Sequence, residues 1–507
     1  MKSSKIYTLG TITSSISIVV SILANIAIVP ILLNNLGKEQ YGIWLTLSSI
    51  FGAMNIADLG IGQSVSKLIS QNSDTEDREE YITSIISTAF FTSVMISIVI
   101  LLINIVISFF AEKILNLDGY NIQNLYIILC VNFLINFVFS IFNNILIGYK
   151  RIYLSNILII IRSILMLVSN YAFFKYSNDI KKLAIVYTVT SVIVFVISII
   201  FIKKRSKGTI ISIKAYDKKL LKVILKPGIF FFLIQVSGII VYNTDNIILT
   251  NFIGAEIVAL YFSAYKIIDI FMKLIFVVSD NIFPFISALH GKKDIGQIRT
   301  LNIITSKVSI IMCVFLSIMY YFFSSEIIDI WLGKGNFIGY DIILVLCLIL
   351  VINANTHNAG VYINALYKHK KTAYLAVIEA ILNLILSLIL VNRIGVLGVV
   401  LGTLIASLLT SAWFTPYYCC KILGINFKRY FIDVILKNII LAFLFTMLIF
   451  IQKQFINIDV FWKLISCFAF NFIIFLILSY GIAFNKIEKS KLKEMYNKVI
   501  KPKFRRV

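Results

Sequence analysis

The chain has 507 residues, of which 59% are apolar and only 14% charged, and its mean hydropathy is +0.94. So few charged residues cannot cover the surface of a soluble protein of this length, which excludes that class. The net charge of +23 is expected to come mostly from cytoplasmic loops and to attract acidic lipid. We therefore expect no nucleic-acid-binding surface.

Apolar runs long enough to cross a bilayer recur along the whole chain, since a spanning helix needs about 20 apolar residues. Hydropathy predicts fourteen spans, at Leu9–Leu33, Tyr41–Ser70, Ile82–Phe110, Ile122–Tyr149, Ile152–Phe174, Leu183–Ile202, Gly228–Phe252, Ile257–Leu289, Ile298–Phe323, Phe337–Tyr367, Ala373–Val391, Gly395–Cys420, Val434–Ile451 and Val460–Phe484. The sequence thus predicts an all-α polytopic membrane protein.

The distribution of basic residues predicts the side on which each loop lies. With the N-terminus inside, the cytoplasmic loops and tail hold most of the 47 Lys and Arg residues, as the positive-inside rule requires. Fourteen spans then place both termini in the cytoplasm. No predicted outer loop is much longer than Ser324–Gly339, which leaves no room for a soluble catalytic domain.

Two pairs of similar motifs indicate an internal repeat. Gly-x-Glu-x-x-x-x-Trp/Tyr begins at Gly37, after the first span, and at Gly254, after the seventh. Asn-x-Leu, followed by two basic residues, ends the fourth span at Asn144 and the tenth at Asn364. Because six spans is an even number, both halves enter the membrane in the same direction, which suits alternating access through a central cavity. The predicted parts are an N-terminal six-helix lobe at 1–203, a basic cytoplasmic loop at 204–227, a parallel C-terminal six-helix lobe at 228–423, two additional spans at 424–485 and a basic cytoplasmic tail at 486–507.

One stretch of the chain has an unusual combination of residues for a membrane-spanning segment. Residues Pro30–Lys67 join two apolar runs through a short polar turn, and Asp58 then lies beside Gly60 and Gly62. A charged residue inside a membrane-spanning run costs free energy, and two glycines weaken the helix there. This combination indicates a functional site. This stretch, together with Asn243-Thr244-Asp245-Asn246 later in the chain, resembles the polysaccharide transporter or O-antigen flippase family. That family is the oligosaccharidyl-lipid branch of the multidrug/oligosaccharidyl-lipid/polysaccharide exporter superfamily.

The resemblance covers nearly the whole chain and implies a function. It implies a flippase that moves undecaprenyl-pyrophosphate-linked oligosaccharide repeat units across the bacterial cytoplasmic (inner) membrane. The product would be O-antigen of lipopolysaccharide or capsular polysaccharide, and the sugar stays open. Membrane lipids, the polysaccharide polymerase and the chain-length regulator are the partners that this resemblance implies.

Nine charged residues fall at membrane depth, where each costs roughly 2.5–3.5 kcal/mol on insertion scales. They are Asp58, Arg162, Asp245, Lys266, Asp269, Lys273, Asp280, Lys307 and Glu379. The four in span eight, from Lys266 to Asp280, share a helical stripe about 60° wide. We expect this stripe to line the cavity or to form a ladder of ion pairs, and both interpretations stay open.

The basic members of the set are predicted to bind the pyrophosphate. They are Arg162, Lys266, Lys273 and Lys307. A guanidinium grips phosphate oxygens in a bidentate manner, which makes Arg162 well suited to this role. The alternative for Arg162 is an ion pair with a carboxylate on another helix, such as Asp58.

The acidic members of the set are candidates for ion coupling or gating. They are Asp58, Asp245, Asp269, Asp280 and Glu379. A carboxylate in the membrane can carry a proton or hold sodium. The alternative for Asp58, Asp245 and Glu379 is hydrogen bonding to neighbouring polar groups.

The sequence contains no nucleotide-binding loop, zinc motif or Cys-x-x-Cys spacing, so we expect no cofactor, metal or catalytic residue.

Two other functions are alternatives to the flippase. A cation-coupled multidrug exporter of the same superfamily is expected to favour acidic over basic cavity residues. A membrane polysaccharide polymerase is expected to carry a sizeable outer loop. The driving force, the membrane potential or an ion antiport, stays open.

Overall fold

The computed structural model describes residues 3–72, 79–203, 211–225, 229–456, 458–485 and 489. All regular secondary structure in these residues is helical, and thirteen of the helices are long and apolar enough to cross a membrane. The prediction of an all-α polytopic membrane protein is therefore confirmed. The chain divides into two compact units, Met1–Phe262 and Ser263–Val507. The predicted boundaries of the six-helix lobes stay a prediction, and the basic tail at 486–507 lies almost wholly outside the described residues.

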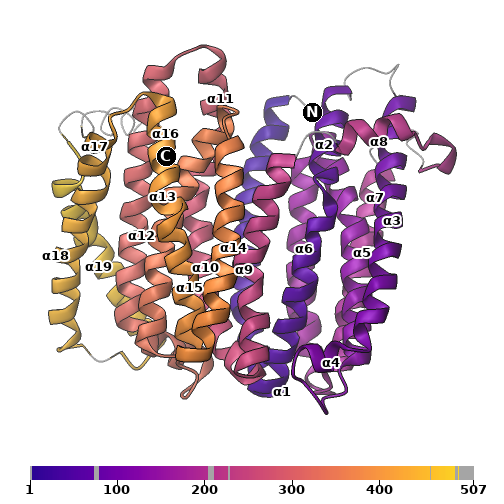
Figure 1. Cartoon of the computed structure of the whole chain (residues 1–507), viewed down its shortest axis with the longest axis horizontal. Helices are drawn as coiled ribbons and strands as arrows, with labels where there is room; N and C mark the ends of the chain where they lie inside the picture. The colour runs from indigo at the N-terminus through magenta and orange to yellow at the C-terminus, as the bar shows by residue number, and fades with distance from the viewer. Residues whose placement is uncertain are drawn as a thin grey trace. The chain divides into compact units, whose positions relative to one another are not determined.

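The helices of the first unit follow one another in the order seen in Figure 1. They are α1 (Ser3–Ala53), η1 (Met54–Asp58), α2 (Ile61–Asn72), α3 (Glu79–Ser108), α4 (Ala111–Ile114), α5 (Gln123–Gly148), α6 (Ile152–Phe173), α7 (Ile180–Lys203), η3 (Ile213–Ala215), α8 (Lys218–Leu225), α9 (Ile229–Phe252) and the start of α10 (Ala255–Asp280).

The helices of the second unit begin with the rest of α10. They continue with α11 (Phe283–Gly291), α12 (Ile295–Leu332), α13 (Tyr340–Ala365), α14 (Lys370–Ile394), α15 (Val396–Leu409), α16 (Ser411–Leu423), α17 (Phe427–Tyr430), the π-helical turn η4 (Phe431–Leu436), α18 (Lys437–Lys453) and α19 (Phe461–Ile482).

The first candidate span is long enough for two crossings. It covers Ile12–Asp58, 47 residues, more than twice the length that one crossing needs. Gly37 interrupts α1 with a φ of 76°, a conformation that glycine adopts without steric cost. This break falls in the turn that the sequence predicts between the first two spans. The exact number of crossings and the orientation of the termini stay predictions.

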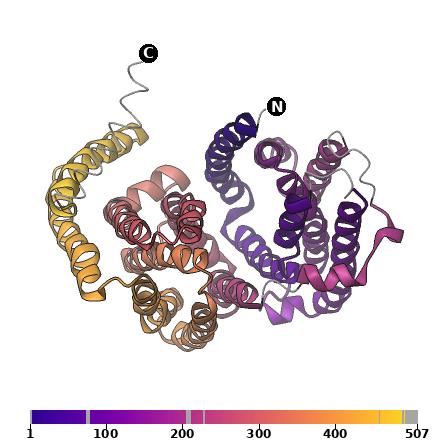
Figure 2. The same ribbon diagram turned by 90° about the horizontal axis from the view of Figure 1, so that it is seen from above.

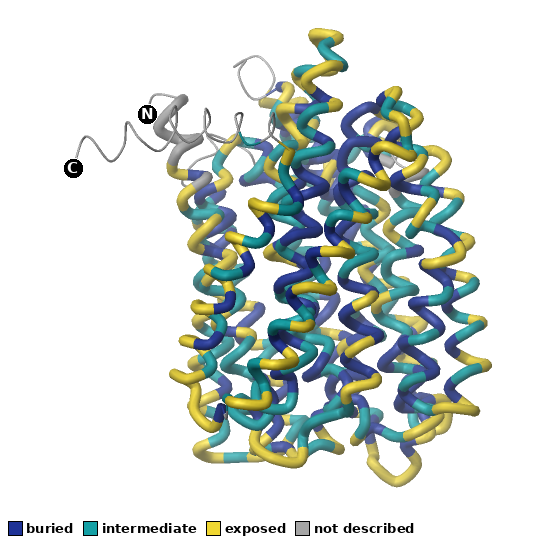
Figure 3. Tube along the Cα trace, turned by 90° about the vertical axis from the view of Figure 1, so that its left-hand side faces the viewer, coloured by how far each residue is buried: buried dark blue, intermediate teal, exposed yellow. Residues whose placement is uncertain are grey.

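Packing in the first unit centres on α5. Helices α2, α3 and α7 pack on α5, and α1 packs on α6 and α9. The apolar core here includes Val65 and Ile69 of α2, Ile85 of α3 and Ile145 of α5. Exposed positions alternate with buried ones along the helices (Figure 3), as expected where one side packs on protein and the other faces lipid.

Packing in the second unit joins α12 to the last two helices. Phe315 and Phe323 of α12 share one apolar cluster with Phe445 of α18 and Phe475 of α19. Figure 2 shows α18 and α19 at the edge of this unit. A second cluster joins α11, α13 and α16. The two additional C-terminal helices are thus attached to the second unit through α12.

Candidate substrate-binding site

Three neighbouring helices of the first unit, α5, α6 and α7, line a half-open cavity of about 180 Å³. A volume of this size holds about six water molecules at the density of the liquid. Its lining comprises Asn136, Phe139, Ser140 and Asn143 of α5, Leu158, Ile159 and Arg162 of α6, and Ser191, Val194, Phe195 and Ser198 of α7. Arg162 is the one charged residue in this lining.

The guanidinium of Arg162 has no protein partner among the described residues. It forms no hydrogen bond or ion pair with any residue that the structure describes, and its side chain is exposed. The alternative of an ion pair with Asp58 is therefore absent from this structure. A cation without a carboxylate partner is costly at membrane depth unless water or an anionic ligand reaches it. The geometry thus leaves the charge of Arg162 available to a ligand.

Only some of the polar side chains around the same cavity have hydrogen-bond partners among the described residues. The amide of Asn136 donates to Ser191 Oγ at 3.0 Å, and Ser191 Oγ donates to Asn132 Oδ1 at 2.8 Å. In contrast, the buried Oδ1 atom of Asn143 has no hydrogen-bond partner among the described residues. A buried acceptor without a donor costs about 1–3 kcal/mol, so this atom is suited to accept from a ligand hydroxyl or from water. Sequence reasoning missed Asn143, because an asparagine in an apolar helix carries no charge signal.

Asp58 has a local role at the end of the first candidate span. The backbone N–H groups of Gly60 and Gly62, next to the start of α2, lie close to its carboxylate. Leu59 and Gly60 have left-handed φ angles of 50° and 77°, which turn the chain between η1 and α2. A Cβ at Gly62 would lie 2.3 Å from Asn144 Nδ2, so glycine lets α2 approach α5. These contacts match the hydrogen-bonding alternative for Asp58.

Asp245 lies in a buried polar group of the first unit. Its side chain on α9 is only 7% exposed, and Oδ2 accepts a hydrogen bond from the Tyr261 hydroxyl at 2.7 Å. The neighbouring Asn246 donates to Ser49 Oγ at 2.8 Å. The Oδ1 atoms of Asp245 and Asn246 have no partner among the described residues. Two unpaired acceptor oxygens are compatible with a bound proton or cation, and the coupling role of Asp245 stays a prediction.

The charges of α10 in the second unit form ion pairs. Asp269 Oδ2 lies 3.6 Å from Lys266 Nζ and 2.8 Å from Lys273 Nζ. One carboxylate shared by two lysines leaves this group with a net charge of +1. The side chain of Lys273 is 56% exposed, which a charge at this depth tolerates only on a wet surface. The ladder is therefore present, and the role of this stripe in lining a cavity stays a prediction.

Asp280, at the end of α10, pairs with a residue that the sequence analysis did not select. Its Oδ1 lies 2.8 Å from Nε2 of His357 on α13, and the His357 ring stacks on Phe276 at 3.7 Å between centroids. His357 lies 77 positions from Asp280, so no spacing rule links them. The signal that could have found this pair is a histidine inside a spanning run.

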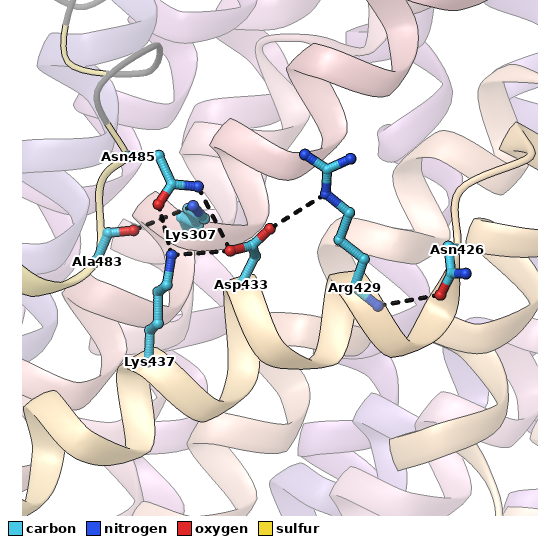
Figure 4. Close-up of polar contacts among 7 residues, drawn as sticks. All are labelled: Lys307, Asn426, Arg429, Asp433, Lys437, Ala483 and Asn485. Carbon is cyan, nitrogen blue, oxygen red and sulfur yellow. Dashed lines mark hydrogen bonds and ion pairs between the residues drawn. The ribbon is translucent and has the colours of Figure 1, made fainter.

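The side chain of Lys307 reaches the residues that follow the last helix (Figure 4). Its side chain is 0% exposed, and Nζ donates to the carbonyl oxygen of Ala483 at 3.1 Å. Asp433 of the π-helical turn lies nearby and pairs with Lys437 at 2.9 Å and Arg429 at 3.6 Å. These contacts favour a role for Lys307 in attaching α19 to α12 over a role in binding phosphate.

Glu379 of α14 bridges a helix break. Its Oε1 accepts hydrogen bonds from Ser407 Oγ at 2.6 Å and Ser411 Oγ at 3.0 Å. These serines belong to α15 and α16, on either side of Thr410, whose φ of −122° and ψ of −92° interrupt the helix. Glu379 is thus placed to fix the geometry of this break, which agrees with a gating role and with the hydrogen-bonding alternative.

The nine predicted residues do not form one cluster among the contacts of the described residues. Within the first unit, Arg162 lines the α5–α7 cavity, Asp58 lies just before α2 and Asp245 lies beside Tyr261. Within the second unit, the ladder on α10 brings three predicted residues together: Lys266, Asp269 and Lys273. No cluster of three or more potential metal-ligating side chains was found among the described residues.

Comparisons with known proteins identify the fold. The chain is similar to the structure titled as an inward-facing multidrug resistance MATE family transporter of the MOP superfamily, at 16% identity and a TM-score of 0.70, covering 80% of this chain and 94% of that one. It is similar to the lipid II flippase MurJ in an inward closed conformation, at 18% identity and a TM-score of 0.67, covering 93% and 98%. A MOP superfamily transporter from Pyrococcus furiosus matches at 17% identity and a TM-score of 0.61, covering 83% and 96%. The protein thus has the fold of MOP superfamily transporters.

Comparison of the sequence with protein families identifies the family of this chain. No curated protein matches the chain. The profile of the family described as "Polysaccharide biosynthesis protein" matches residues 8–290, more than half of the chain. The match includes the stretch around Asp58, the cavity of Arg162 and the buried group of Asp245. The chain therefore belongs to the polysaccharide biosynthesis protein family, as its resemblance to polysaccharide transporters predicts.

Proposed function

We propose that this protein is a flippase that moves a polyprenyl-pyrophosphate-linked oligosaccharide from the cytoplasmic to the outer leaflet of a bacterial cytoplasmic membrane. Three observations support the proposal. The family is one of polysaccharide biosynthesis, the fold is shared with a lipid II flippase, and the chain is multi-pass. The single observation that carries it is the guanidinium of Arg162 in the α5–α7 cavity, which pairs with no residue that the structure describes.

In this proposal Arg162 binds a phosphate oxygen pair of the substrate. The planar guanidinium offers parallel N–H donors, which match the spacing of phosphate oxygens and bind them more strongly than neutral donors do. The cavity of about 180 Å³ is far smaller than a whole lipid-linked oligosaccharide. It therefore takes one group of the substrate, while the polyprenyl chain stays in lipid.

The amides and hydroxyls of the same cavity supply further contacts. Asn143 Oδ1 accepts from a sugar hydroxyl, which satisfies its unpaired lone pairs. Phe139 and Phe195 provide an apolar wall beside these polar groups. A mixed lining of this kind orients a ligand through few polar contacts, which is typical of small-molecule sites.

Lys266 and Lys273 are a second cationic group in the proposal. Their shared carboxylate leaves one net positive charge on α10, which attracts the dianionic head group.

Two sources of energy for transport are consistent with these charges. The membrane potential supplies about 2.3 kcal/mol per charge at 100 mV, and the buried Asp245 could carry a counter-ion.

The charge of the cavity disfavours the drug-exporter alternative. An exporter of cationic drugs is expected to place acidic residues in its cavity, whereas Arg162 is the charged residue in the lining here. No specific contact in the described residues favours the polymerase alternative.

The proposal is tested in cells that lack the gene. We expect undecaprenyl-linked repeat units to accumulate facing the cytoplasm, and wild type to clear them. Arg162→Ala should fail to clear them at matched protein abundance, and Arg162→Lys should restore part of the activity. Normal clearance without the protein, accompanied by increased drug sensitivity, would refute the flippase and favour the exporter.

A further inference from the structure

A short lysine-rich segment of the first unit carries an amphipathic helix. Residues 211–225 contain η3 and α8, and α8 packs on α2 and α3. Leu220 and Ile224, four positions apart on one face of α8, are buried in the same apolar cluster as Ile69 and Ile82. Residues four apart share a helix face, so these contacts fix which side of α8 meets the protein.

Hydrogen bonds hold the segment firmly against α3. The backbone N–H of Ser212 donates to Ser87 Oγ at 3.1 Å, and that of Asp217 donates to Thr88 Oγ1 at 3.0 Å. The carboxylate of Asp217 caps α8 by accepting from the backbone N–H of Lys219 at 2.7 Å. The position of the segment along α3 is therefore well defined.

The length of α3 allows the depth of this segment in a bilayer to be inferred. Helix α3 has 30 residues and is about 45 Å long, roughly the thickness of a bilayer with its head groups. Ser87 and Thr88 lie about 12 Å from its first residue, Glu79, at 1.5 Å per residue. When the length of α3 is matched to the thickness of the bilayer, segment 211–225 falls near the boundary between head groups and hydrocarbon.

The outward side of the segment is basic. Lys214, Lys218, Lys219 and Lys222 are exposed, and none of them forms an ion pair with a described residue. At 100° per residue, Lys218 and Lys222 point away from the buried face of α8. The side chain of Ile213 is 73% exposed beside these lysines. An exposed isoleucine next to lysines is typical of an interfacial membrane segment.

We propose that segment 211–225 is a docking surface for acidic phospholipid head groups. The lysines pair with head-group phosphates, and Ile213 enters the apolar boundary beneath them. Because α8 packs on both α2 and α3, the bound lipid stabilises the contact between these two helices. Charge complementarity at head-group depth favours lipid over a soluble acidic protein. The inference does not depend on which substrate is transported.

The test uses the purified full-length protein in a neutral detergent. Phosphatidylglycerol and phosphatidylcholine are added in parallel, and the lipid retained is counted by native mass spectrometry. The variant Lys218→Gln/Lys219→Gln/Lys222→Gln removes three charges from α8. A matched control, Lys368→Gln/Lys370→Gln/Lys371→Gln, removes three charges from exposed residues around the start of α14.

We expect wild type to retain phosphatidylglycerol in preference to phosphatidylcholine. The α8 variant should lower the affinity for phosphatidylglycerol at least tenfold, and high salt should reduce this difference. Arginine at the same three positions should keep the affinity. Ile213→Asn, which changes no charge, should weaken retention of phosphatidylglycerol severalfold. The inference is overturned if the α8 variant retains phosphatidylglycerol as well as the control variant does. It is also overturned if wild type retains both lipids equally, or if a soluble protein displaces the bound lipid.

Discussion

Arg162 and Lys307 are both cations at similar predicted depth, yet the structure gives them different surroundings. Arg162 of α6 lines a cavity and has no protein partner among the described residues. Lys307 of α12 is fully buried and donates to Ala483 of the C-terminal segment. Depth in the membrane therefore does not decide the role of a charge. What decides it is whether the helix face bearing the charge meets another helix or an open space.

The largest effect is expected from Lys307→Ala. The variant leaves the Ala483 carbonyl without its donor and removes buried methylene groups, which together cost about 3 kcal/mol. Thermal unfolding of the purified protein should show a clearly lower Tm. Transport per folded molecule should stay near wild type. Loss of transport at unchanged stability would contradict the structural role of Lys307.

Asn143→Asp would give Arg162 the carboxylate neighbour that it lacks. Both residues line the same cavity, so the new charge should neutralise the guanidinium and repel phosphate. We expect clearance of lipid-linked oligosaccharide to fall about tenfold, measured against Asn143→Ala at equal abundance. The alanine control removes the unpaired oxygen without adding charge and should lose much less. Equal losses in both variants would show that the charge of Arg162 is not what binds the substrate.

Glu379→Gln tests whether a partly buried carboxylate acts by charge or by position. Glutamine keeps an acceptor oxygen for Ser407 and Ser411, so the break at Thr410 should persist. We expect at most a threefold loss of transport, with a larger loss in Glu379→Ala because both hydrogen bonds disappear. If glutamine abolishes transport as fully as alanine, the charge itself is required, as ion coupling predicts.

The smallest effect is expected at the exposed pair Asp459 and Lys463, before and within α19. A hydrogen bond from Lys463 Nζ at 2.6 Å, together with its charge, lowers the pKa of the Asp459 carboxyl. The stabilisation is present above the unfolded pKa of about 3.9 and is lost as pH falls through the lower folded pKa. Lys463→Gln should thus lower Tm slightly at pH 6 and not at acidic pH. An equal change at both pH values would contradict this origin.

Much of the fold could be predicted from composition and hydropathy. The candidate spans and the turn at Gly37 fall within the apolar runs and the turn that the sequence predicts, because lipid requires backbone groups to be hydrogen-bonded within helices. The breaks at Gly60 and Thr410, inside two predicted spans, were not predicted. The i,i+3 and i,i+4 pairs around Asp269 were equally predictable from helical spacing.

The parts of the site that escaped prediction depend on contacts between helices. Helical periodicity cannot tell that Arg162 faces a cavity while Lys307 faces α19. The pairing of Asp280 with His357 joins α10 to α13, and Asn143 has its unpaired oxygen only because of the packing around α5. Asp58 lies close to the backbone N–H groups of Gly60 and Gly62, and its coupling role stays a prediction.

The proposed transport depends first on the binding of the substrate phosphate by Arg162. The most direct measurement is the affinity of the purified full-length protein for a short-chain prenyl pyrophosphate oligosaccharide, determined by calorimetry. We predict a tenfold to hundredfold weaker affinity for Arg162→Ala than for wild type, partly restored in Arg162→Lys, with Tm unchanged in both. Unchanged affinity in Arg162→Ala would contradict the account.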